Sequence, residues 1–138
     1  MASGYKVFVS GVGGIGKSEF VKAFAKEYKK EFTNILYFNY ASDLKNLITD
    51  IDFSDDREED SDNEKFKRHN RYLRSLKEDT LIVIDNFNTT ASEEDLLDVV
   101  MKYKCRIIFT TRSKFDCGHT YQLNEISADG LFGLFRKL

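Results

Sequence analysis

The chain has 138 residues, of which 41% are hydrophobic and 32% charged, and its formal net charge is −2. This length and balance are typical of one soluble globular domain, and the small charge favours neither nucleic acid nor an anionic membrane as a partner. No apolar stretch reaches the roughly 20 residues of a membrane helix, and the N-terminal sequence lacks the pattern of a secretory signal. Cys105 and Cys117 are isolated, so we expect two reduced cysteines in a cytoplasmic protein rather than a disulfide framework or a zinc site.

Short apolar runs alternate with segments of helical period along the chain. In order, the pattern predicts a strand at residues 5–10, a helix at 17–30, strands at 35–40 and 80–85, a helix at 92–103, strands at 106–110 and 120–123, and a helix at 131–138. The helix at 92–103 begins with Ser92-Glu93-Glu94-Asp95, which is close to a capping box. Strands that alternate with helices are typical of βαβ units. We therefore predict a single α/β domain over residues 1–138, with a largely parallel sheet covered by helices on both faces.

One segment departs from this pattern in its charge. Residues 50–64 contain nine acidic side chains and one basic one, whereas residues 65–77 contain six basic side chains and no acidic one. We interpret residues 52–63 as a solvated acidic loop, and residues 65–77 as an exposed basic helix anchored by Phe66, Leu73 and Leu76. A nucleic-acid surface is the alternative for the basic helix, but the acidic neighbour would neutralise its field.

A glycine-rich segment follows the first predicted strand. The run Gly11-Val12-Gly13-Gly14-Ile15-Gly16-Lys17-Ser18 fits the phosphate-binding pattern GxxxxGK[ST]. Glycines let backbone N–H groups approach phosphate oxygens, and the helix that follows adds the partial positive charge of its N-terminus. Lys17 is expected to reach the β- and γ-phosphates and Ser18 to ligate Mg²⁺, with Glu19 next to them in the first helical turn. The segment predicts a nucleotide site, since it lies between a strand and an amphipathic helix, as the pattern requires.

Asp85 is the predicted acidic partner of this loop. It ends the apolar strand at residues 80–85, and ligands of open parallel sheets bind at the carboxyl ends of the strands. We therefore expect Asp85 to help bind Mg²⁺. ATPases of this plan usually place a second carboxylate next to it as the general base, but Asn86 occupies that position and an amide is no base. Asp79 and Glu93 are the alternatives for that role.

Arg112 follows the predicted strand at 106–110, after two threonines. A guanidinium at this edge of the sheet would compensate the charge of a γ-phosphate. The catalytic set predicted from the residues is therefore Lys17, Asp85, Asn86 and Arg112.

Four segments, in this order, carry a family resemblance: GVGGIGKS, LIVIDNF, CRIIFTTR and YQLNEISADGLFGLFRKL. Together they resemble the nucleotide-binding domain of STAND-type ATPases, the NB-ARC group. The resemblance implies a three-layer P-loop NTPase fold with five parallel strands in the order 5-1-4-3-2. It also implies an ATP/ADP-binding regulatory switch of a signalling or defence protein, with slow Mg²⁺-dependent hydrolysis. The implied partners are adenine nucleotide, other domains of the same longer chain, and further copies of the protein in a nucleotide-dependent assembly.

The chain departs from the family pattern in two respects. Asn86 stands where the family usually has a second acid, which argues against efficient turnover. The family also continues into small helical and winged-helix domains, which include a proline-containing turn, and this chain has no proline. The resemblance therefore implies the nucleotide-binding core of a longer multidomain protein.

Three other functions fit parts of the sequence. A module that holds ADP without turnover is the main alternative, because Asn86 supplies no base. A small P-loop kinase would need an arginine-bearing lid, which the basic segment 65–77 could supply. A GTPase is disfavoured, because Ser113-Lys114-Phe115-Asp116 has the wrong first residue for guanine recognition. His69 and His119 show no metal-ligand spacing.

Overall fold

The sheet contains five parallel strands. The computed structural model describes residues 6–11 and 16–122. The strands are β1 (Lys6–Ser10), β2 (Asn34–Asn39), β3 (Thr80–Asp85), β4 (Arg106–Thr111) and β5 (His119–Gln122). Their spatial order is β2-β3-β4-β1-β5, and every neighbouring pair is parallel. The predicted order is confirmed, since β4 separates β1 from β3.

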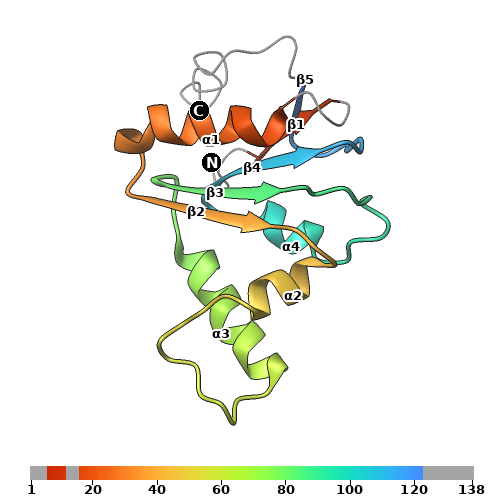
Figure 1. Ribbon diagram of the computed structural model, residues 1–138. Helices are drawn as coiled ribbons and strands as arrows, with labels where there is room; N and C mark the ends of the chain where they lie inside the picture. Colours follow the sequence, from red (N-terminus) through yellow and green to blue (C-terminus); the bar gives the residue numbers. More distant parts are fainter. Residues whose placement is uncertain (1–5, 12–15, 123–138) are drawn as a thin grey trace.

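Helices cover both faces of this sheet (Figure 1). Helix α1 (Lys17–Glu27) lies on one face, while α2 (Leu44–Thr49), α3 (Asp62–Ser75) and α4 (Leu97–Met101) lie on the other. A hydrophobic core lies on each face of the sheet, and because side chains alternate along a strand, each central strand contributes side chains to both cores. Val7 and Val9 pack with Val21 and Phe24 of α1, whereas Phe8 packs in the core on the opposite face. The three-layer α/β architecture is thereby confirmed.

Two predicted helices differ from those observed. The helix predicted at 17–30 ends at Glu27 and is followed by the short 3-10 helix η1 (Lys29–Glu31). The helix predicted at 92–103 is reduced to α4, because Glu94 turns inward. Its carboxylate accepts hydrogen bonds from the Leu44 N–H at 2.8 Å and from the Leu96 N–H at 3.2 Å. The expected capping box is therefore wrong, and α2, which Glu94 helps to cap, was not predicted.

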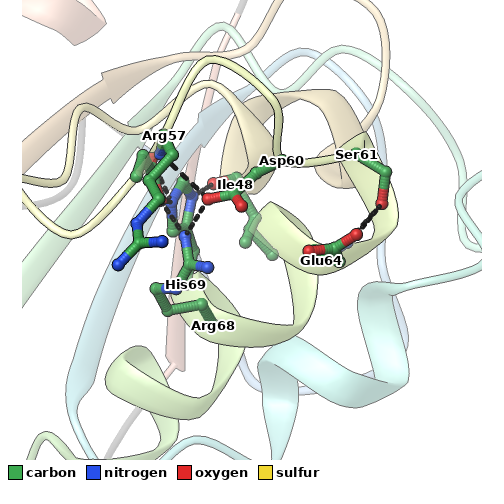
Figure 2. Close-up of polar contacts among 8 residues, drawn as sticks. Ile48, Arg57, Asp60, Ser61, Glu64, Arg68 and His69 are labelled. Atoms are coloured by element: carbon green, nitrogen blue, oxygen red, sulfur yellow. Dashed lines mark hydrogen bonds and ion pairs between the residues drawn. The ribbon is translucent and has the colours of Figure 1, made fainter.

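The acidic segment is more ordered than the predicted solvated loop. Asp56 and Asp60 both contact Arg68 of α3, with oxygen to guanidinium distances of 2.5 and 3.1 Å. His69 is fully buried, and its Nδ1 and Nε2 lie 2.6 Å from the Ile48 carbonyl oxygen and 2.7 Å from Asp56 Oδ2. Figure 2 shows His69 beside Ile48 of α2 and Arg68 beside Asp60 of the loop.

Helix α3 begins earlier than the predicted basic helix. Ser61 caps it by accepting a hydrogen bond from the Glu64 N–H at 3.2 Å, and its hydroxyl donates to the Glu64 side chain at 3.1 Å (Figure 2). Acidic residues therefore form the first turn of α3, and the predicted loop 52–63 ends at Ser61. Leu73 is buried and Phe66 and Leu76 are partly buried, as predicted.

Two predictions at the C-terminal end lie outside the described residues: Leu123 in the fifth strand and the helix at 131–138. Among the helices of the described ranges, none combines the length and the apolar character needed to cross a membrane.

Candidate nucleotide-binding site

The carboxyl ends of four strands meet at one edge of the sheet. The register pairs Ser10 of β1 with Thr111 of β4, and Asn39 of β2 with Asp85 of β3. Helix α1 begins just beyond β1, so its first turn lies at the same edge. A parallel α/β sheet offers its binding crevice at this edge. The segments that the sequence analysis singled out are thus brought together.

Gly16 joins the glycine-rich segment to the first turn of α1. Its φ of 84° and ψ of 30° place it in the left-handed region, which glycine adopts without the steric cost of a side chain. Gly16 also accepts the first helical hydrogen bond, from the Phe20 N–H at 2.8 Å. Lys17, Ser18 and Glu19 therefore occupy the first turn of the helix. Val12, Gly13, Gly14 and Ile15 lie outside the described residues.

Asp85 is the centre of the polar contacts at this edge. Its Oδ1 accepts hydrogen bonds from Ser18 Oγ at 2.8 Å, from the Asn86 N–H at 3.1 Å and from Thr110 Oγ1. Its Oδ2 accepts one from the Tyr37 hydroxyl at 2.5 Å. Burial alone would raise the pKa of this carboxyl, but the hydrogen bonds outweigh it and hold the pKa below its usual value. Asp85 is therefore an anion in the folded protein.

Two cationic side chains, those of Lys17 and Arg112, line one hollow at this edge of the sheet. Lys17 Nζ donates a hydrogen bond to the Gly11 carbonyl at 2.9 Å. The pKa of Lys17 is lowered, first by desolvation and then by the charge of Arg112, although Asp85 acts in the opposite direction. Arg112 follows β4, and its N–H donates to Asn88 Oδ1 at 2.8 Å. Two cations held within electrostatic reach of each other favour the binding of an anion between them.

Asn86 occupies a strained turn directly after Asp85. Its φ is 60°, and its N–H also donates to Thr110 Oγ1 at 2.8 Å. Its side-chain Nδ2 donates to Asn39 Oδ1 at 2.8 Å. An amide held in this way can position a water molecule but cannot take its proton.

Neither alternative carboxylate lines the hollow that Ser18 and Asn86 border. Asp79 precedes β3 at the end opposite to Asp85. The two residues are about 20 Å apart, because a strand rises ~3.3 Å per residue. Glu93 accepts a hydrogen bond from Thr90 in the turn before α4 and borders a different hollow, next to Phe66. Asp79 is therefore too distant to act as the general base in this conformation, and the alternative Glu93 stays a prediction.

A cavity of about 330 Å³ opens at this edge. Its lining includes no residue of α3 among those described, so the basic helix does not form the lid that a small kinase would need. Among the predicted site residues, Lys17, Ser18, Asn86 and Arg112 border it, and Asp85 contacts it through its hydrogen bond to Ser18. The lining consists of residues 16–19, Asn86, Asn88, Thr110 and Arg112.

The donor set fits Mg²⁺ bound together with phosphates. The Ser18 hydroxyl and the Asp85 carboxylate are hard oxygen donors that lie in contact, with Ser18 Oγ 2.8 Å from Asp85 Oδ1. The described residues contain no group of three or more His, Cys, Asp or Glu that could hold a metal alone. Mg²⁺ is commonly held by one or two protein oxygens, water and substrate phosphates, so this sparse set suits it.

Three contributors to the site were missed by the sequence analysis. Thr110 carried a weak signal, because it ends a strand next to Arg112. Tyr37 and Asn39 carried none, because their role depends on β2 pairing with β3. The local periodicity of a sequence does not predict which strands pair across a crossover connection.

The comparison with protein families agrees with this geometry. The family model described as NB-ARC domain matches residues 2–131, nearly the whole chain. No curated protein sequence matches the chain significantly.

Proposed function

The chain belongs to the NB-ARC domain family, and we propose that it is a regulatory switch that binds ATP or ADP and hydrolyses ATP slowly with Mg²⁺. NB-ARC domains are nucleotide-binding modules of signalling and defence proteins. The observation that carries the proposal is the convergence of Lys17, Ser18 and Arg112 on one cavity, with Asp85 hydrogen-bonded to Ser18 directly behind its lining. A cluster of two cations and a hydroxyl–carboxylate pair matches the charges of a magnesium-bound triphosphate.

Each residue has a defined role in this proposal. Lys17 and Arg112 compensate the phosphate charge, and Lys17 exchanges its hydrogen bond to the Gly11 carbonyl for bonds to phosphate oxygens. Ser18 and Asp85 would hold Mg²⁺, which would neutralise part of the phosphate charge. Asp85 suits this role because its pKa is low and it stays ionised at neutral pH.

Asn86 makes the proposed hydrolysis slow. Its amide is bonded to Asn39 and supplies no base, so activation of water lacks the contribution of general-base catalysis. The same observation favours a second candidate, a module that holds ADP without turnover. In either case the proposed partners are adenine nucleotide, other domains of a longer chain and further copies of the protein, in the cytoplasm.

Calorimetric titration tests the proposal. We expect ATP and ADP to bind, GTP to bind more weakly, and Mg²⁺ to strengthen the binding of ATP. Lys17→Ala should weaken binding by roughly 30- to 1,000-fold, equivalent to about 2–4 kcal/mol, because phosphate charge is left uncompensated. Lys26→Ala, an exposed lysine in the last turn of the same helix, is the matched control and should bind like the parent. Binding by Lys17→Ala within threefold of the parent would place the nucleotide elsewhere.

A further inference from the structure

Tyr37 lies on the edge strand β2, two residues before the end of the strand at Asn39. The register pairs Tyr37 with Val83 and Asn39 with Asp85, so these side chains share the sheet face that α1 covers. The Tyr37 ring is 40% exposed, and Lys22 Nζ of α1 lies 5.8 Å from its centroid. Its hydroxyl points at Asp85 Oδ2, at 2.5 Å. The phenol therefore borders the Asp85 carboxylate on the outer edge of the sheet.

The two oxygens of Asp85 have different surroundings. Oδ1 accepts from three donors, Ser18 Oγ, the Asn86 N–H and Thr110 Oγ1. Oδ2 accepts from Tyr37 alone among the described residues. A carboxylate oxygen offers about two lone-pair positions, so Oδ1 is saturated and Oδ2 retains acceptor capacity. Of the two oxygens, Oδ2 is the one that can accept a hydrogen bond from a water bound to a metal ion.

Tyr37 is the contact that orients this oxygen. Without the phenol, the donors on Oδ1 would hold only one end of the carboxylate. A phenol is protonated at neutral pH, so the Tyr37 hydroxyl is the donor in its contact with Asp85 Oδ2. The packing of Lys22 over the ring restricts the phenol on the side of α1.

We propose that Tyr37 is a positioning residue for the magnesium-bound nucleotide, acting by holding Asp85 Oδ2 in place. The inference rests on the proposed nucleotide binding and adds a residue of β2 to that site. Groups that orient metal-binding carboxylates typically contribute 10- to 100-fold to metal affinity. The effect of the hydroxyl should therefore appear in the dependence on Mg²⁺ and not in nucleotide affinity without metal.

Tyr37→Phe removes only the hydroxyl and tests this inference. Binding of a non-hydrolysable ATP analogue is measured by calorimetry without Mg²⁺ and over a Mg²⁺ series. We expect Tyr37→Phe to match the parent within twofold without Mg²⁺, and to need about tenfold more Mg²⁺ for half of the metal-dependent gain. Tyr72→Phe is the matched control, because Tyr72 is similarly exposed at 45% but packs on Phe53 beside α3. It should behave like the parent.

A double-variant comparison separates positioning from a structural role. In an Asp85→Asn background, Tyr37→Phe should have no further effect on the Mg²⁺ dependence, since the two side chains act as a unit. An unchanged Mg²⁺ dependence in Tyr37→Phe, an equal loss with and without Mg²⁺, or a full effect in the Asp85→Asn background would each overturn the inference and leave the proposed function standing. If the parent bound no nucleotide at all, both would fall.

Discussion

Asn86 shows how one residue can serve the backbone and limit the chemistry. Its φ of 60° lies in the left-handed region, which Asn and Asp adopt more readily than other residues with a side chain. The turn lets its N–H bond to both Asp85 Oδ1 and Thr110 Oγ1. Either Asn or Asp would satisfy this backbone conformation, and Asp would lose only the exposed hydrogen bond from Nδ2 to Asn39 Oδ1, so the choice of the amide bears more on function than on folding.

Asn86→Asp is therefore expected to accelerate ATP hydrolysis without unfolding the protein. The parent should turn over well below the ~10 s⁻¹ median of enzymes. A carboxylate at this position can accept the proton of an attacking water, which is worth on the order of 10²-fold or more. The measurement is steady-state phosphate release at saturating Mg²⁺ and ATP.

Asn88→Asp is the control for the added charge. Asn88 borders the same cavity but accepts the Arg112 N–H, so the variant should not accelerate hydrolysis. Brisk turnover by the parent, unchanged by Asn86→Asp, would mean that another group is the base and would remove the main support for a slow switch.

Among the structural elements, the short helices α2 and α4 depend on one buried carboxylate. Glu94 accepts hydrogen bonds from the Leu44 N–H, the Leu96 N–H and, at 2.7 Å, the Tyr40 hydroxyl. The last bond and burial raise the pKa of Tyr40 to about 12. Helices of this length are not stable from propensity alone. Glu94 thus connects the turn before α4 to the start of α2.

We expect Glu94→Ala to lower the free energy of unfolding by about 2–3 kcal/mol, because buried donors lose their acceptor. Urea unfolding measures this as a lower midpoint with an unchanged slope. Asp95→Ala changes the adjacent exposed carboxylate and should stay within about 0.5 kcal/mol of the parent. Similar losses in the two variants would show that the Glu94 contacts contribute little.

For the whole molecule, the carboxylates around α3 contribute to the response of stability to acid. Desolvation acts to raise the pKa of Asp56, but hydrogen bonds from His69 and Arg68 bring it below its usual value. A backbone hydrogen bond from Arg57, with the Arg68 contact, lowers the pKa of Asp60. Below the unfolded pKa of about 3.9 the unfolded chain binds more protons than the folded one. Stability from these groups is complete above that pH and is lost as the pH falls through the lower, folded values.

Thermal unfolding between pH 6 and pH 2 measures this loss. The parent's melting temperature should fall as the pH drops below about 4. At pH 6, Asp56→Asn should have a lower melting temperature than the parent. On acidification its melting temperature should fall by less than that of the parent, because one of the titrating contacts is already gone. Asp55→Asn changes the exposed neighbour and should follow the parent. A parent-like acid response in Asp56→Asn would contradict this assignment.

Several features could be predicted from the sequence because they depend on neighbouring residues. A strand buried on both faces needs an unbroken apolar run, so 80–85 was predicted with its observed bounds, Thr80–Asp85. A phosphate-binding loop needs its glycines, Lys17 and Ser18 in one short segment. The strand order, by contrast, followed from the family resemblance and not from the residues.

The remaining features were decided by tertiary structure. Tyr37 and Asp85 are 48 positions apart, and they meet only because β2 pairs with β3 in one register. Glu94 and Leu44 are 50 positions apart, and their contact replaced a locally favourable capping box. His69 is buried because the acidic segment folds back onto α3, although charge alone favoured a solvated loop. Local propensities amount to a few tenths of a kcal/mol per residue, so one buried hydrogen-bonded contact made at long range outweighs them.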